Sequence, residues 1–265
     1  MKILITTSNQ QLRLLEPHAT LFNRYWPEQQ VTILGFDTTN LPRLPDNFEY
    51  VSLGRQDDFG RYWTDPLIPY VKGLDEDCFV LMMGDFLLTD YVEIEKFKLL
   101  ENEIKYGDAD KAILDTHLSA YTVPYKPGIR ELRQEAPYRT TLHPAIWRKE
   151  YFLKFLKPGL TAWQFEAHNM PESQHDNARI LLPEMPSGIT ATDPAQIMRE
   201  SAINDVIKVT NVYVKGIPIP RPNTGHPFGA SSGITKEDIL LICRHINPEL
   251  CEQLESVLQD DKKYK

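Results

Sequence analysis

The feature that most restricts the fold is an unbroken apolar run, Cys78 to Met83, that leads into Gly84-Asp85-Phe86. A strand that is apolar on both faces has to be covered on both faces, as in the parallel sheets of α/β proteins. Ligands of open α/β sheets gather beyond the carboxyl ends of the strands. The run therefore predicts a central strand, and it places Asp85 where chemistry is expected.

Alternating strand and helix patterns on either side of this run extend the prediction to an α/β fold with a mostly parallel central sheet. Strands are predicted over residues 2–6, 30–36, 48–53, 77–83, 109–114 and 206–215. Helices are predicted over residues 11–25, 64–74, 92–105 and 235–258, and residues 144–156 are expected to be a strand edge and then a helix. Another helix starts at Thr161, with Gln164 in capping-box position. Residues 121–144 are predicted to be a loop or short hairpin, and residues 170–194 to be irregular.

Size and charge set limits on what such a chain can do. At 265 residues, 42% of them hydrophobic, one main domain is expected. A net charge of -8 argues against broad binding to phosphate backbones, although a local basic patch from Arg130 to Lys149 stays open beside its reading as a solvated face.

Neither a disulfide framework, a zinc site nor a leader is indicated. The three cysteines have no ligand-like spacing. The first apolar run is too short for a signal peptide or a membrane span. We therefore expect a cytoplasmic setting with no membrane span.

Asp85 is a candidate metal ligand on chemical grounds. A transferase that releases a diphosphate has to neutralise it, and a hard divalent cation held by carboxylates and phosphates does so. Gly-Asp turns are also common for structural reasons. Asp90 is expected to cap the next helix rather than bind metal.

Two longer segments resemble a known family. The segment from Phe79 to Lys96 looks like the metal-motif strand of certain small bacterial and viral GT-A glycosyltransferases, where Asp-Asp-Tyr or Asp-Asp-Phe follows the apolar run. The segment from Pro144 to Glu166 resembles their acceptor-side helix pair. With the first strand and Arg61 to Asp65, the similarity spans roughly residues 1–170.

The resemblance implies a single GT-A-like domain over residues 1–265, with irregular acceptor-side insertions and a C-terminal helix. Residues 1–115 would form the nucleotide-sugar-binding half, and residues 116–265 the acceptor-binding half. It also implies a divalent metal, Mn²⁺ or Mg²⁺, at Asp85. Such families often have a first acidic residue where this sequence has Gly84, so metal dependence is in question and His226, in a C-terminal loop, is the second candidate ligand. A surface-loop role for His226 stays open.

The same resemblance assigns roles on the acceptor side. Glu166 matches the acid that would serve as general base of an inverting transferase. Its alternative role is to offset the dipole at a helix N-terminus. Trp163 and His117 are candidate acceptor contacts, while Trp147 is expected to pack in the core.

For the donor, the family pattern points to the loop after the first strand and to the start of the helix at residue 64. The end of the second strand and two basic residues near the C-terminus are further candidates on chemical grounds. The candidate contacts are Thr6, Thr7, Ser8, Asp37, Arg61, Asp65, Lys215 and Arg221. The hydroxyls and carboxylates suit ribose and uracil, and each could equally be a helix cap. Lys215 and Arg221 could instead meet the diphosphate directly.

The leading prediction is transfer of a sugar from a UDP-sugar or similar donor to a hydroxyl acceptor, either a glycan or a lipid-linked glycan. A hydroxymethylated base in DNA is the minority acceptor. A nucleotidyltransferase would ordinarily have a Gly-rich basic loop after its first strand, which Thr6 to Gln10 is not. A non-catalytic carbohydrate- or protein-binding module on the same fold remains the other alternative, because fold does not fix activity and Gly84 weakens the metal motif.

Overall fold

The structure is a computed structural model that describes residues 1–185, 188, 193, 196–197, 204–211, 213–214 and 217–218. Its centre is a nine-stranded sheet in the order β3-β2-β1-β4-β9-β6-β10-β8-β7. The strands are β1 (Lys2–Thr6), β2 (Val31–Gly35), β3 (Phe48–Ser52), β4 (Cys78–Met83), β6 (Lys111–Ile113), β7 (Thr122–Lys126), β8 (Ile129–Leu132), β9 (Ala145–Arg148) and β10 (Ile180–Pro183).

Strand direction divides this sheet in two. The first four strands in the order run parallel. Beyond them β9 is antiparallel to both β4 and β6, β10 is parallel to β6, and β8 is antiparallel to β10 and β7. Only β8 and β9 are therefore reversed, and the other strands of the sheet point the same way. This is the mostly parallel α/β architecture that the sequence predicts.

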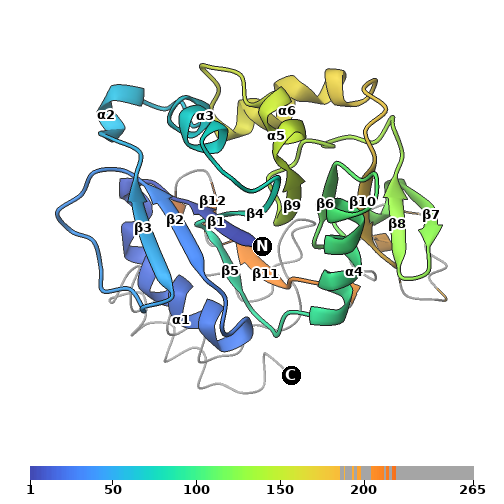
Figure 1. The fold of residues 1–265 in the computed structure, drawn as a ribbon, viewed down its shortest axis with the longest axis horizontal. Helices are drawn as coiled ribbons and strands as arrows, with labels where there is room; N and C mark the ends of the chain where they lie inside the picture. The colour runs from blue at the N-terminus through green and yellow to red at the C-terminus, as the bar shows by residue number, and fades with distance from the viewer. Residues whose placement is uncertain are drawn as a thin grey trace.

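Helices cover both faces of the sheet, as Figure 1 shows. One face carries α1 (Leu15–Tyr25), which follows the 3-10 helix η1 (Asn9–Leu14), and α4 (Ile94–Lys105). The other face carries α3 (Thr64–Lys72), α5 (Lys149–Phe155) and α6 (Ala162–Ser173). Two short elements complete the helices, α2 (Gln56–Phe59) and η2 (Ser119–Tyr121).

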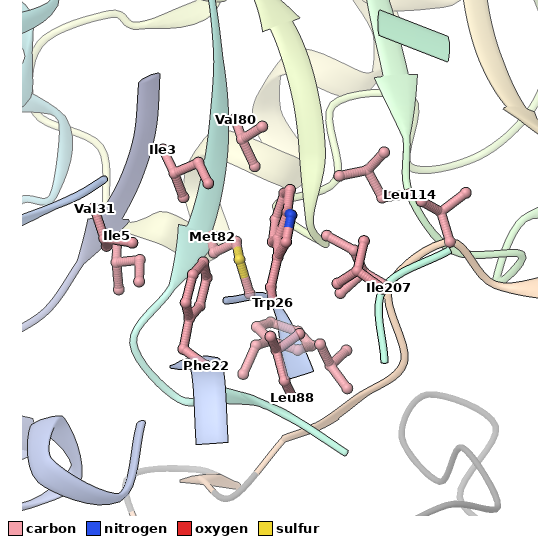
Figure 2. Packing of buried hydrophobic residues seen from close by; sticks show 14 of the residues in the cluster. Ile3, Ile5, Phe22, Trp26, Val31, Val80, Met82, Leu88, Leu114 and Ile207 are labelled. Carbon is pink, nitrogen blue, oxygen red and sulfur yellow. The ribbon is translucent and has the colours of Figure 1, made fainter. Parts of the chain in front are cut away.

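Alternate residues of each strand feed two separate cores. On β1, Ile3 and Ile5 pack under α1, whereas Leu4 packs under α3. Figure 2 shows the α1 side, where Phe22 and Trp26 meet side chains of the central strands. Because successive side chains of a strand point to opposite faces, the continuous apolar runs of the sequence are used on both sides.

A small second sheet supports the site edge. The strand β5 (Phe86–Leu88) pairs antiparallel with β11 (Val209–Asn211). The strands β12 (Tyr213–Val214) and β13 (Ile217–Pro218) form a two-stranded pair of their own. Segments separated by more than a hundred residues thus meet directly after the Gly84-Asp85 turn.

Most predicted elements of the first half are confirmed, and several later predictions are wrong in detail. Residues 170–194 are not irregular throughout, since they contain the end of α6 and the buried strand β10. Strand β5 was not predicted. The residue that caps α4 is Glu93, while Asp90 pairs with Lys208. The predicted hairpin between residues 121 and 144 is present as β7 and β8.

Two caps show which local signals were reliable. Thr161 and Gln164 form the capping box that their spacing predicts. The type of residue at the start of the predicted helix over residues 64–74 suggests Thr64 as its cap, but the cap is Trp63 and Thr64 is the first residue inside α3. The Thr64 hydroxyl exchanges hydrogen bonds with the backbone of Leu160. The predicted helix over residues 235–258 lies outside the described residues. Within the described part, the helices are all too short or too polar to cross a membrane.

Candidate functional site at the carboxyl edge of the sheet

The candidate site lies along the edge of the sheet where the parallel strands end. β1, β2, β4 and β6 finish at this edge, and the reversed strand β9 begins there. Polar residues follow or precede these strand ends directly. They are Thr6, Thr7 and Ser8 after β1, Asp37 after β2, Asp85 after β4, Asp115 and His117 after β6, and His143 before β9.

The Gly84-Asp85 turn is pressed against the end of β1. The Gly84 amide donates to the Thr6 carbonyl at 2.8 Å. A Cβ atom at position 84 would lie 3.0 Å from that carbonyl oxygen and 3.2 Å from the Thr7 side chain. Gly84 thus has a packing reason, because the acidic residue that related motifs often carry here would push the two strand ends apart. Asp85 itself is half-buried in the turn.

The hydroxyls after β1 are used inside the protein. Thr6 donates to the sulfur of Met83 and accepts from the indole N–H of Trp63 at 3.3 Å. Thr7 is buried against Gly84, and its hydroxyl has no hydrogen-bond partner in the described part of the chain. Ser8 is half-buried and precedes η1. Of Thr6, Thr7 and Ser8, the three predicted contacts to the nucleotide-sugar donor at this strand, Ser8 is the most accessible.

Asp37 opens onto a hollow of about 620 Å³ at the ends of β2 and β3. The hollow is lined by Phe36, Asp37, Thr38, Thr39, Leu41, Tyr50 and Ser52. The hydroxyl of Ser52 donates to the Asp37 carboxylate, and the Tyr50 hydroxyl bonds to the Phe36 backbone at 2.8 Å. This surface combines an aromatic and aliphatic lining with one fixed carboxylate, a composition typical of small-molecule sites.

Asp115, His117 and His143 form the tightest polar cluster of this edge. The Asp115 carboxylate lies between two imidazoles: Oδ1 contacts Nδ1 of His117, and Oδ2 lies 2.7 Å from Nδ1 of His143. The two rings are stacked with centroids 3.7 Å apart. Asp115 is 5% exposed and His117 is 9% exposed. His117 is thus a member of an interior cluster, whereas we predicted an acceptor contact.

The pairing of β6 with β9 assembles this cluster. Ile113 lies opposite Ala145 in the register, so the residues two positions beyond Ile113 and two before Ala145 face each other. The turn after β4 also reaches it, since the Phe86 ring lies 5.1 Å from the His143 ring. We did not single out Asp115 or His143 from the sequence. Asp115 follows a buried strand just as Asp85 does, and that rule could have found it.

The charges in the cluster depend on one another. Burial favours the neutral form of His117, and the net effect lowers its pKa to about 4. Burial acts in the same sense on His143, but the Asp115 and Glu166 carboxylates outweigh it, so the pKa of His143 is raised. Burial alone would raise the pKa of Asp115, yet the two histidines hold it below its usual range. Of the two imidazoles, His143 is therefore the one whose protonated form its surroundings favour.

Glu166 holds the loop that carries His143. Its Oε1 accepts from the Leu142 amide at 2.6 Å and from the Thr141 hydroxyl at 3.2 Å. From the other side the buried ammonium of Lys111 donates to the carbonyls of Arg139 and Thr141, at 3.0 and 2.7 Å. The ammonium lies 3.9 Å from the centre of the Trp147 ring, which is fully buried as predicted. The loop before β9 is thus fixed on both sides.

The remaining predicted residues lie farther from this cluster or outside the described part. Arg61 is exposed before α3. Asp65 accepts from the Gly159 amide at 2.6 Å and so ties α3 to the loop before α6. Trp163, on the first turn of α6, is 77% exposed. Lys215, Arg221 and His226 fall outside the residues whose side chains are described.

In the described part of the chain, one group of His, Cys, Asp and Glu side chains brings its ligand atoms within 4.8 Å of one another, namely Asp115, His117 and His143. Asp85 is not a member of that group. The edge therefore contains a carboxylate in a turn, an Asp-His-His cluster and a half-buried Glu166. Such an arrangement can bind a cation and can accept a proton.

Comparisons with known proteins give no family for the chain. No protein-family model and no curated protein sequence matches it. Solved structures with a similar arrangement include S. aureus TarS, with 15% identity over 77% of this chain and 64% of that chain and a TM-score of 0.46. A CMP:2-keto-3-deoxy-manno-octonic acid synthetase complexed with CTP has 13% identity over 76% and 97%, and a TM-score of 0.41.

A galactosyltransferase, LgtC, in complex with donor and acceptor sugar analogs is also similar. It has 12% identity over 58% of this chain and 60% of that chain, and a TM-score of 0.34. At these scores the likenesses decide nothing about activity. These similar structures include both a galactosyltransferase and a CMP:2-keto-3-deoxy-manno-octonic acid synthetase.

Proposed function

We propose that this chain is a glycosyltransferase that moves a sugar from a nucleotide-sugar donor, with a UDP-sugar as the expected class, to a hydroxyl acceptor with inversion. The observation that carries the proposal is the alignment along one edge of the sheet. The Asp37 hollow lies at the end of β2, and the Gly84-Asp85 turn lies at the end of β4. The Glu166 carboxylate reaches the edge from α6, where it accepts from the Leu142 amide in the loop before β9. A nucleotide, a diphosphate and an acceptor hydroxyl need these three kinds of place in this order.

The hollow beside Asp37 is the proposed place of the nucleoside. Its carboxylate, fixed by Ser52, can accept hydrogen bonds from a base N–H or from ribose hydroxyls. The Tyr50 and Phe36 side chains in the lining offer apolar surface to the base. Ser8, at the end of β1, is the next polar group along the edge toward Asp85.

The diphosphate is proposed to lie over the turn at Asp85. A divalent cation bound there would neutralise the leaving diphosphate. Gly84 supplies no second carboxylate, so the donor phosphates would have to complete the metal shell at this turn. The hydrogen bond from the Gly84 amide to the Thr6 carbonyl holds the turn, and with it Asp85, against the end of β1.

Glu166 is the proposed general base. Within the described residues both hydrogen bonds to its carboxylate go to Oε1, and Oε2 accepts none. Oε2 would take the proton of the acceptor hydroxyl while the hydroxyl oxygen bonds to the sugar C1 and the C1–O bond to the diphosphate breaks. A single displacement of this kind inverts the anomeric centre.

The acceptor is proposed to approach past Trp163. A large aromatic side chain this exposed, one turn before Glu166 on the same helix, is suited to stack on the apolar face of a sugar. A glycan or lipid-linked glycan therefore fits the proposal best. A hydroxymethylated base in DNA is the minority acceptor.

A panel of nucleotide sugars tests the proposal, with release of nucleoside diphosphate as the readout. Turnover of one donor is expected, and Glu166→Gln should lower kcat by about 10²- to 10⁴-fold. Glu172→Gln, on the exposed side of α6, is the matched control and should leave the rate unchanged. Asp90→Asn is the matched control for Asp85→Asn.

Two results would contradict the proposal. Formation of pyrophosphate from a nucleoside triphosphate and a sugar phosphate, with no donor turnover, would identify a nucleotidyltransferase instead. Binding of a nucleotide sugar without turnover of any acceptor or of water would leave a carbohydrate-binding module.

A further inference from the structure

We propose that Asp115, His117 and His143 bind one first-row transition-metal ion of the Zn²⁺, Co²⁺ and Mn²⁺ class, at a centre separate from the Asp85 turn. This inference does not depend on glycosyl transfer. Of its three side chains, His117 was predicted to contact the acceptor, and Asp115 and His143 were not predicted as site residues.

The position of the three ligand atoms is the first argument. They come from the ends of two adjacent strands, and the β6–β9 register brings them to one point. Asp115 and His143 lie 2.7 Å apart through Oδ2 and Nδ1, and all three ligand atoms fall within 4.8 Å. Three protein atoms at such separations can occupy one face of a single coordination sphere.

The donor set is the second argument. Two imidazoles and one carboxylate suit Zn²⁺, Co²⁺, Mn²⁺ and Fe²⁺, whereas Mg²⁺ and Ca²⁺ prefer oxygen ligands alone. The imidazoles approach through Nδ1 with their rings stacked face to face. That orientation brings both nitrogens to the same carboxylate.

The buried negative charge is the third argument. Thr116, between the two ligands of β6, donates its amide and its hydroxyl to the buried Asp205 at 2.8 and 2.6 Å. Within the described residues, neither Asp115 nor Asp205 has a lysine or arginine at ion-pair distance, and Lys111 points its ammonium at two carbonyls. A buried carboxylate without such a partner, as at Asp115, is costly unless another cation offsets it.

The site is partly open to solvent at His143. The side chain of His143 is 15% exposed, in contrast to the 8% and 7% of the other two ligands. Three protein ligands with an opening to solvent are typical of catalytic metal sites, in which water or substrate takes the remaining position.

The test uses the full-length protein after treatment with a chelator. Titration with Co²⁺ should give one equivalent of bound ion with visible d–d absorption, displaced by Zn²⁺ and not by millimolar Mg²⁺. Asp115→Asn and His143→Gln should each weaken Co²⁺ binding by at least about 100-fold, more than the loss of an outer-shell partner causes. His168→Gln, an exposed histidine on α6, and Asp85→Asn should bind like the unaltered protein.

A measurement without variants guards against misfolding. Pulsed EPR of Cu²⁺ bound to the unaltered protein should count two imidazole nitrogens. Absence of stoichiometric Co²⁺ and Zn²⁺ binding would overturn the proposal and leave a hydrogen-bonded imidazole–carboxylate cluster. Binding that is lost in Asp85→Asn and kept in Asp115→Asn would overturn it as well, because the ion would then sit at the turn.

Discussion

The two halves of the central sheet bury different chemistry. Around β3, β2, β1 and β4 the buried polar residues are threonines and the single histidine His18. Around β9, β6, β10 and β8 the interior holds Lys111, Arg139, Asp115 and His117. Buried charge costs stability unless it is fully hydrogen-bonded, so the second half gives up stability to fix the loops at the site edge. The first half supplies the stable platform.

Removal of Arg139 should have the largest effect on stability. This fully buried guanidinium donates to the carbonyls of Ser173, Leu132, Arg133 and Ala178. Arg139→Ala removes all four of these hydrogen bonds, and within the described residues only the Ala178 carbonyl keeps a second side-chain donor, the Gln134 amide at 3.0 Å. We expect a loss of about 3–5 kcal/mol in the free energy of unfolding. Urea denaturation measures it. Arg24→Ala, exposed on the platform half, should change stability by less than about 0.5 kcal/mol. Equal effects would remove the contrast between the halves.

The platform half should carry its own dependence on pH through His18. Burial lowers the pKa of His18 to about 4, below its ordinary value of 6.5, and its Nε2 has no partner in the described part of the chain. The unfolded chain therefore binds the proton first, so stability is complete above pH 6.5 and is lost as pH falls through 4. Between pH 7.5 and 4.5 the loss from this residue should be about 2–3 kcal/mol.

The contribution of His18 is measured as the difference in unfolding free energy between the unaltered protein and His18→Leu, determined at both pH values. His168→Leu, at an exposed position, should retain the full dependence. A difference that stays constant with pH would show that His18 is protonated in the folded protein without cost.

Gly84→Ala should have an intermediate effect, because it lies at the junction of the platform and the site edge. The new methyl group would meet the Thr6 carbonyl at 3.0 Å and the Thr7 side chain at 3.2 Å. We expect a loss of about 1–3 kcal/mol. Gly73→Ala is the control, since a Cβ atom there meets its neighbours at 3.5 Å or more. Thermal unfolding of both variants gives the result, and an unaffected Gly84→Ala would leave the glycine without a packing role.

The smallest predicted effect concerns the capping box of α6. Thr161→Ala removes the hydroxyl that accepts from the Gln164 amide at 3.2 Å, for an expected loss of about 1 kcal/mol. Thr161→Ser keeps the acceptor and should restore most of the stability. Because α6 carries Glu166, a greater loss of activity than of stability in Thr161→Ala would sharpen the link between this helix and the site.

Local signals were sufficient for the platform half. Its strands follow one another with helices between them, so periodicity, caps and breakers within one window predicted β1, α1, β2, β3 and β4. They also placed Asp37 and Asp85 beyond strand ends. The same signals missed β10, a four-residue strand that lies within a polar, proline-bearing stretch.

The Asp115–His117–His143 cluster was less accessible to such reading. His143 is in a loop with no periodicity, and its neighbour in space is 28 positions away. Only the reversal of β9 between β4 and β6 brings the two together.

The sequence by itself determined that the chain is an α/β protein with a buried central strand and polar residues beyond Met83, because apolar runs and caps act within a few residues. The tertiary structure alone decided which polar groups share that edge. Hydrogen bonds between strands form regardless of sequence separation, and the antiparallel strand β9 brought His143 to Asp115 and His117. The approach of β1 also left little space at Gly84, where a Cβ atom would lie 3.0 Å from the Thr6 carbonyl oxygen.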